Sequence, residues 1–194
     1  EDRGKLHDAF DLALWQALSP QEHAEMKRGK RIDAIPFDPE RRRNSVLFEN
    51  AKGQQIIVRG APEEILRRCQ DVDAFSRRQL LDWVAEAGRR GERTLAVAVK
   101  VCSSKQGYTL YDEEHLSFVG LISFADTLKS TARETIAQAK ALNVTVKIIT
   151  GDSKEVAGAV GYAVGLLKTP VAVITGQELE EMPHEERRLA IEEG

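Results

Sequence analysis

Residues 44–60 read NSVLFENAKGQQIIVRG and contain two short runs of side chains that favour β-strands. The runs NSVLFEN and QQIIVRG are joined by AKG at residues 51–53, a short connection that ends in glycine. Two strand-like runs on either side of such a turn predict a β-hairpin, whose strands are antiparallel. We therefore expect this half of the chain to be built on an antiparallel sheet.

The segments around the hairpin complete an α+β pattern. Apolar residues at helical spacing predict a helix over residues 6–18, and Ser19 is a suitable N-cap for a second, short helix. The other expected elements are strands over 31–37 and 93–102, a helix that begins at Pro62, and a helix over 76–91. Residues 1–116 are thus predicted to form an α+β domain, an antiparallel sheet with flanking helices.

The second half of the chain has a different rhythm, because strand-like and helical segments alternate. Strands are expected at 118–126, 144–150 and 171–175, and helices at 130–143 and 153–166. Alternation of this kind is typical of a parallel, Rossmann-like α/β sheet. We predict a second, partial α/β domain over residues 117–194.

Composition excludes several classes of function. The formal net charge of −3 provides no basic field that would attract nucleic acid, so we expect no nucleic-acid partner. Cys69 and Cys102 lie far apart and the four histidines are scattered, which predicts reduced thiols and no metal site. The sequence contains no run of roughly 20 apolar residues, the length that a membrane-spanning helix needs. We expect a soluble monomer, and its charged ends suggest a piece of a larger protein.

The segment VTVKIITGDS, residues 144–153, ends its strand-like run in Thr150-Gly151-Asp152. Ligands of parallel sheets bind at the carboxyl ends of strands, and Asp126 closes another expected strand. A threonine hydroxyl and a glycine amide are suitable donors to a phosphoryl oxygen, helped by the following helix N-terminus. From the residues alone, a second interpretation stays open, in which Thr150 and Asp152 only cap the helix.

Two further stretches carry candidate binding residues. Phe37 precedes Arg41, Arg42 and Arg43, a combination that can stack a base and neutralise phosphates. The alternative is a core phenylalanine beside a solvated basic turn. In RGAPEEIL, which starts at Arg59, a glycine follows the strand and allows a ligand or another backbone to approach closely.

Taken in order, these stretches resemble the cytoplasmic region of P-type ATPases, which move cations across membranes through an aspartyl-phosphate. The nucleotide-binding domain of that family has a phenylalanine, basic residues and a Ser-Val strand, as at residues 37–46. It then has Lys-Gly-Ala-Pro-Glu, similar to RGAPE at 59–63, and an arginine before a small apolar strand, here Arg93. The phosphorylation domain has Gly-x-x-x-x-x-Asp-Pro-x-Arg/Lys, similar to 120–129, and Thr-Gly-Asp, as at 150–152.

The resemblance implies a role for each of these residues. Phe37 would stack on the adenine of ATP, and Arg59 with Gly60 would line the same pocket. Asp11 lies where the family has an acidic residue near the adenine amino group. Basic side chains near the phosphates would be Arg42 and Arg93. In the phosphorylation domain, which is haloacid-dehalogenase-like, Thr150 and Gly151 would hold the phosphoryl group while Asp126 and Asp152 line the cleft.

The sequence departs from the family pattern at several positions. Arg59 replaces the usual lysine, Asn44 stands where methionine is common, and no proline follows Asp126. The phosphorylation motif Asp-Lys-Thr-Gly-Thr is absent, as is the downstream Gly-Asp-Gly-x-Asn-Asp motif that completes the Mg²⁺ site. We therefore expect this chain to bind ATP without turning it over.

The resemblance also implies partners and a location. The partners would be ATP and the remaining domains and transmembrane helices of the same polypeptide, an integral plasma-membrane protein with this part in the cytoplasm. IPFDPERRRNSV, residues 35–46, most resembles magnesium-transport pumps, with calcium or proton pumps as alternatives. A further alternative is a haloacid-dehalogenase-like phosphatase. Such an enzyme would need a nucleophilic Asp-x-Asp or Asp-x-Thr motif after its first strand, and the sequence supplies none there. A non-catalytic interaction module is the remaining alternative.

Overall fold

The structure is a computed structural model that describes residues 9–193. The chain divides into two compact units. The first unit comprises Glu1–Arg78 and Leu95–Phe124, and the second comprises Gln79–Thr94 and Ala125–Gly194. The domain boundary expected after residue 116 stays a prediction.

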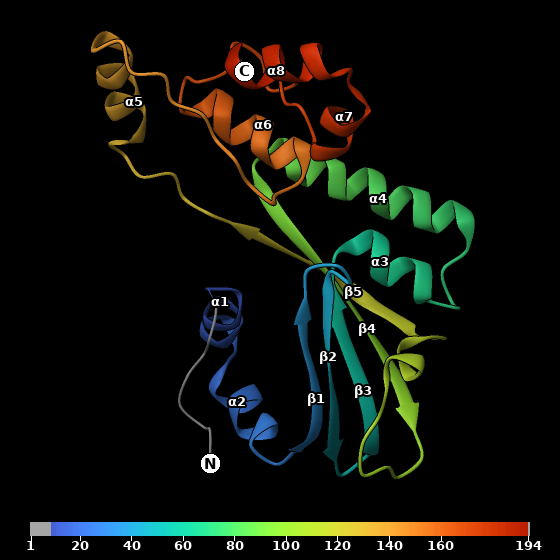
Figure 1. Cartoon of the computed structure of the whole chain (residues 1–194). Helices are drawn as coiled ribbons and strands as arrows, with labels where there is room; N and C mark the ends of the chain where they lie inside the picture. The colour runs from blue at the N-terminus through green and yellow to red at the C-terminus, as the bar shows by residue number, and fades with distance from the viewer. Residues whose placement is uncertain (1–8, 194) are drawn as a thin grey trace. The chain divides into compact units, whose positions relative to one another are not determined.

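A five-stranded sheet forms the centre of the first unit (Figure 1). Its order follows the sequence, and β1 to β4 pair antiparallel with their neighbours. The strands are β1 (Lys30–Asp38), β2 (Arg43–Asn50), β3 (Gly53–Gly60), β4 (Glu92–Cys102) and β5 (Ser117–Ala125). The predicted hairpin is confirmed, because β2 and β3 pair from Asn50↔Gly53 at the turn to Arg43↔Gly60 at the open end.

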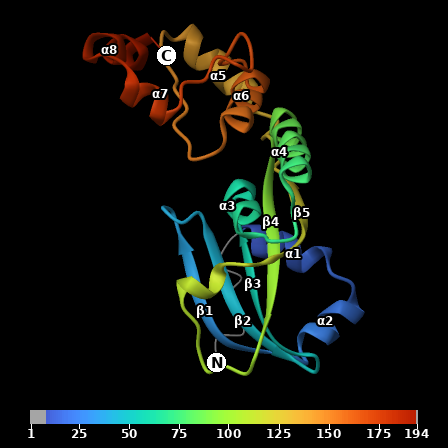
Figure 2. The same ribbon diagram turned by 90° about the vertical axis from the view of Figure 1, so that its right-hand side faces the viewer.

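The core of the first unit lies on one face of this sheet. Along β3 every second side chain is buried, which is the two-residue period of a strand with one face in the core. Ile56, Val58 and Leu47 are fully buried, as are Ile65 and Leu66 of helix α3 (Pro62–Arg68). Figure 2 shows α3 beside the sheet. Burying each such side chain contributes about 1.5–3 kcal/mol.

The other helices of the first unit also match local sequence signals. Helix α1 (Ala9–Ala17) occupies the expected range, although residues 6–8 lie outside the described residues. Phe10 packs edge-on against Phe124 of β5, with ring centroids 4.7 Å apart. Helix α2 (Pro20–Met26) has the expected Ser19 cap, reinforced by a capping box with Glu22. The remaining elements are α4 (Ala74–Arg89), which continues into the second unit, and the 3₁₀ helix η1 (Leu110–Glu113).

The second unit is mainly helical. It contains α5 (Ala132–Ala141), α6 (Lys154–Ala163), α7 (Gly176–Glu181) and α8 (His184–Glu193). Helix α6 packs tightly through its glycines, because a Cβ added to Gly158 would lie 1.8 Å from the carbonyl oxygen of Pro170. Gly88 of α4 faces Glu155 of α6 in the same way, at 2.8 Å.

The parallel sheet expected in this half is not confirmed. Residues 144–150 and 171–175 are not strands, so these two strand predictions are wrong. The segment expected as the first strand of the parallel sheet, 118–126, is strand β5 and lies beside β4 in the five-stranded sheet. A parallel strand is stable only between hydrogen-bonded neighbours. The described residues place no strand beside 144–150, and Ile149 is 99% exposed.

Candidate functional site

Phe37 lies near the end of β1 and is 62% exposed. The β1–β2 pairing shifts register between Ile35 and Asp38, so Pro36 and Phe37 interrupt the ladder. Proline lacks the amide hydrogen that a ladder needs and is tolerated here because β1 is an edge strand. The alternative of a core phenylalanine is therefore wrong. An exposed ring fixed beside a strand irregularity is available to stack on a planar ligand.

The three consecutive arginines of the basic turn, Arg41, Arg42 and Arg43, have different environments. Arg43 is buried, and the side chain of Arg41 is 17% exposed. Arg42 lies between them with a φ of 53°, and its side chain is 54% exposed. Its Nη1 lies 2.6 Å from the carboxylate of Glu63, also exposed, and such surface ion pairs contribute little stability. Of the three, Arg42 presents its guanidinium at the surface.

Arg59 and Asp11 form an ion pair, with Nη1 and Oδ1 2.5 Å apart. The Nε of Arg59 also donates to Oδ1 of Asn44 at 3.1 Å, and these two residues face each other directly in the β2–β3 ladder. Asn44 and Arg59 are two of the positions that depart from the family pattern. The structure shows that the side chains of these two residues contact each other.

Residue 60 must be a glycine because the neighbouring chain leaves no room for a side chain. A Cβ at this position would lie 2.4 Å from the carbonyl oxygen of Arg42 and 2.6 Å from Cβ of Arg43. The close approach that the sequence predicted is therefore made by Arg42, just before β2, and by Arg43, the first residue of β2. It brings Arg59 and the basic turn to the same end of β2 and β3, next to the β1 end that carries Phe37.

In the second unit, Arg93 holds Asp152 through two contacts. Its Nε lies 2.8 Å from Oδ1, and its Nη2 donates to Oδ2 at 2.9 Å. The hydroxyl of Thr150 donates to the same Oδ2 at 3.0 Å and accepts the amide of Asp152 at 3.1 Å. The cap of α6 is Ser153, whose Oγ accepts the amide of Val156. The alternative in which Thr150 and Asp152 only cap this helix is therefore wrong.

The two remaining candidate residues of the second unit are open to solvent. Gly151 is exposed, and an added Cβ would meet no atom within 4 Å. Asp126 is exposed one residue after β5. Thr150, Gly151 and Asp152 thus form one local cluster with Arg93.

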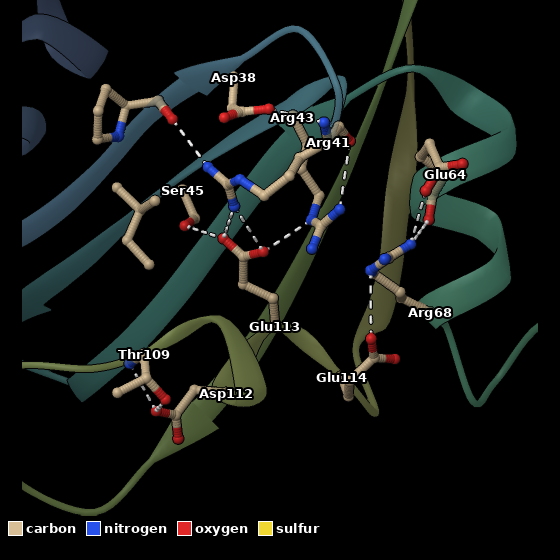
Figure 3. A network of polar contacts seen from close by, with 12 residues as sticks. Asp38, Arg41, Arg43, Ser45, Glu64, Arg68, Thr109, Asp112, Glu113 and Glu114 are labelled. Atoms are coloured by element: carbon tan, nitrogen blue, oxygen red, sulfur yellow. Dashed lines mark hydrogen bonds and ion pairs between the residues drawn. The ribbon is translucent and has the colours of Figure 1, made fainter.

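The fully buried carboxylate of Glu113 was missed by sequence reasoning. It is 0% exposed and accepts hydrogen bonds from Arg41, Arg43 and Ser45 (Figure 3). Its neighbour Tyr108, which is hydrogen-bonded to Ser45, has a pKa raised above its usual value, mainly by burial. Nothing in the local sequence LYDEEHLS marks Glu113, since its partners lie about 70 positions away. The one sequence signal for a buried acidic partner was the arginine triplet, because buried arginines need a carboxylate to balance their charge.

Other chemistry in the described part of the chain is limited. Cys69 is buried, and desolvation raises the pKa of its thiol to about 11, so it is a poor nucleophile at neutral pH. No group of three or more His, Cys, Asp or Glu residues within 9–193 could hold a metal ion. No helix in that range is long and apolar enough to cross a membrane.

The fold and site together define a class, an α+β domain with an exposed aromatic side chain and arginines at one end of an antiparallel sheet. The sequence model described as "P-type ATPase, cytoplasmic domain N" matches residues 1–131. The chain therefore belongs to the P-type ATPase family.

Individual relatives agree with this assignment. Magnesium-transporting ATPase, P-type 1 of Escherichia coli K12 is 37% identical over 193 residues, which cover 93% of this chain and 21% of that protein. The protein of the same name from Salmonella typhimurium LT2 is 38% identical, with 90% and 20% covered. Calcium-transporting ATPase 1 of Lactococcus lactis is 29% identical, with 86% and 20% covered. The chain spans about a fifth of the length of these relatives.

Proposed function

We propose that the first unit binds ATP at the end of the sheet that carries Phe37. The observation that carries this proposal is the exposure of Phe37 at the irregular end of β1, the same end of the sheet as Arg42 and the Arg59–Asp11 ion pair. Stacking a base on an aromatic ring contributes about 1–3 kcal/mol. The ring would take the adenine, and the membership in the P-type ATPase family supports this assignment.

The charged groups around Phe37 suit the rest of the nucleotide. Asp11 would accept a hydrogen bond from the adenine amino group, and Arg59 and Gly60 would line the pocket. Arg42 would meet the phosphates, since its guanidinium is exposed and its present partner Glu63 is a surface carboxylate that a phosphate can replace.

For the second unit we propose a role in phosphoryl transfer within the complete protein. Thr150 and Gly151 would donate to the transferred phosphoryl group, and Asp126 and Asp152 would line the cleft. Thr150 is an exposed residue, and Arg93 fixes the carboxylate of Asp152 beside its hydroxyl. Arg93 would be the basic residue of this unit that reaches toward the phosphates.

The phosphoacceptor aspartate would lie outside this sequence, which contains no Asp-Lys-Thr-Gly-Thr motif. Both oxygens of Asp152 contact Arg93, and residues 9–193 contain no group of three or more His, Cys, Asp or Glu that could hold a metal ion. Mg²⁺ would be held by ATP and by residues elsewhere in the protein. Purified chain should therefore show no magnesium-dependent ATP hydrolysis.

The complete protein would couple ATP hydrolysis, through an aspartyl-phosphate, to cation transport across the plasma membrane. Magnesium is the ion we propose, because the relatives from Escherichia coli and Salmonella are magnesium-transporting ATPases at 37–38% identity. Calcium is the second candidate, because a calcium-transporting relative is 29% identical over a similar range. This chain would then be a cytoplasmic part of that pump.

Calorimetric titration with ATP tests the nucleotide site. We expect a dissociation constant near the millimolar range, which corresponds to about 4 kcal/mol. Phe37→Ala should weaken binding by roughly 5- to 150-fold, the equivalent of about 1–3 kcal/mol of stacking. Phe75→Ala is the matched control, because Phe75 is 71% exposed and lies outside the site. No heat with millimolar ATP, or equal affinity of wild type and Phe37→Ala, would contradict the proposal.

A further inference from the structure

Glu113 is the central residue of a buried ionic network in the first unit. It ends the 3₁₀ helix η1 and has no exposed surface. Oε2 accepts from Nε of Arg43 at 2.7 Å and from Nη1 of Arg41 at 3.2 Å. Oε1 accepts from the hydroxyl of Ser45 at 2.5 Å (Figure 3). One carboxylate therefore binds both outer arginines of the basic turn.

A network of this kind is costly in a protein interior. Removing charged groups from water carries a penalty of several kcal/mol per ion, so well-packed apolar residues often give equal or better stability. Stability alone is thus a weak reason for a buried Glu–Arg–Arg cluster. Its specific effect is geometric, because each hydrogen bond fixes one segment of the chain relative to η1.

The segments that Glu113 fixes flank Phe37 on both sides. Arg41 reaches Glu113 with Nη1 and at the same time donates from Nη2 to the carbonyl oxygen of Pro36 at 2.9 Å. The carboxylate of Asp38 accepts the amides of Glu40 and Arg41, both at 2.9 Å. Phe37 is therefore held between two anchored neighbours, although its ring points into solvent.

Arg42 is fixed in a similar way. Its neighbours Arg41 and Arg43 both bind Glu113, and its own carbonyl oxygen accepts the amide of Ala61 at 2.9 Å. Arg42 has a positive φ, and its side chain is exposed, unlike those of the two arginines that bind Glu113. A left-handed conformation is unfavourable for arginine and persists only where the surroundings impose it.

A second branch of the network reaches β1. The hydroxyl of Ser45, which binds Glu113, also lies 2.7 Å from the hydroxyl of Tyr108. Tyr108 in turn accepts the amide of Ile35 at 3.1 Å, just before the point where β1 leaves its register. The network thus holds the strand on the N-terminal side of Phe37 as well.

We propose that Glu113 is a positioning residue of the nucleotide site, which sets the geometry of Phe37 and Arg42 without touching the nucleotide. This inference rests on the proposed ATP site. Binding to a site already held in the bound geometry avoids the cost of ordering it. Loss of the Glu113 charge should release both side chains and weaken ATP binding through them.

The test is a double-mutant cycle of Glu113→Gln and Phe37→Ala, read as ATP affinity by calorimetry. We expect Glu113→Gln to weaken binding about tenfold in the wild-type background and by less than about threefold in the Phe37→Ala background, because coupled residues are not additive. In nucleotide-free protein, Glu113→Gln should also shift the NMR amide signals of Phe37 and Arg42.

Leu116→Ala is the control for a merely structural effect. Leu116 is fully buried three residues after Glu113, so its truncation should lower the melting temperature while ATP affinity stays within about twofold. If Glu113→Gln does not fold, Arg41→Met replaces it, since this change removes the link from Glu113 to Pro36 and leaves the Arg43 pair intact.

The outcomes separate the two proposals. Wild-type protein that ignores ATP would overturn the nucleotide site itself. Wild-type protein that binds ATP, with a folded Glu113→Gln variant of equal affinity, would overturn only the role of Glu113. Equal weakening of binding by Glu113→Gln with and without the Phe37 ring would overturn the positioning of Phe37, because it would show that Glu113 does not act through that ring.

Discussion

Two similar stretches of sequence adopt different structures in this molecule. QQIIVR in the first unit and VTVKIIT in the second are both short, rich in β-branched residues and followed by glycine. The first is strand β3, paired on both edges, with Ile56 completely buried. The second is not a strand, and Ile149 is 99% exposed.

The difference lies in what is available to pair with each stretch. The neighbours of β3 are β2, joined by a tight turn, and β4, and both are present in the described chain. A parallel strand at 144–150 would need neighbours brought by longer connections. Strand propensity describes how well a residue fits a half-buried pleated surface, so it has no effect where that surface is missing.

The largest expected effect compares the same substitution in the two stretches. Ile56→Ala should lower the free energy of unfolding by about 2–5 kcal/mol, because it leaves a cavity in a packed core. Ile149→Ala should change it by no more than about 0.5 kcal/mol, as is usual for an exposed side chain. Denaturant unfolding of both variants measures the difference. Similar losses in the two variants would show that residues 144–150 are packed after all.

The same contrast explains how much could be predicted from sequence. The β2–β3 hairpin and the Ser19 cap depend on residues close in sequence, and both predictions are confirmed. The prediction of a strand over 144–150 was wrong because the pairing of a strand depends on segments that are distant in the sequence. The buried Glu113 network was missed for the same reason: its members meet only after the chain folds.

The candidate site divides along the same line. Phe37 and the arginines could be selected because their residue types are informative where they stand in the sequence. Which arginine stays at the surface could not, since Arg42 differs from its neighbours only in backbone conformation and partners. The Asp11–Arg59 ion pair joins residues 48 positions apart, and sequence identified each side chain without their contact.

A smaller effect concerns Asn44 and Arg59, the paired departures from the family pattern. Asn44→Met and Arg59→Lys should each weaken ATP binding about threefold to tenfold, because each removes a hydrogen bond that orients a charged group. The double variant should bind better than the product of the two losses, with a coupling of about 0.5–1.5 kcal/mol. Calorimetric titration of all four proteins gives the coupling, and strictly additive losses would show that the two positions act independently.

The smallest effect lies in the second unit and depends on pH. A hydrogen bond from Lys154, 2.5 Å away, followed by bonds from Thr175, lowers the pKa of Glu178 from 4.5 to about 2. A carboxyl group with a lowered pKa stabilises the fold above its unfolded pKa, and that contribution is lost as the pH falls from about 4.5 to about 2. Glu178→Gln should therefore reduce the acid sensitivity of α7 in this range.

The control for Glu178 is Glu180→Gln on the same helix, which also removes an exposed carboxylate but leaves the contact between Lys154 and Glu178 in place. Carbon NMR of the carboxyl groups across the titration reads the midpoint of Glu178 directly. A midpoint near 4.5 would show that the contact with Lys154 does not persist in solution.

The most direct test of the proposed ATP site is an amide NMR spectrum of the whole chain, recorded without and with millimolar ATP. We expect signal changes concentrated at residues 36–45 and 59–61, at the Phe37 end of the first unit, with residues 144–149 unaffected. No change at any residue, or changes confined to the second unit around 150–156, would contradict it.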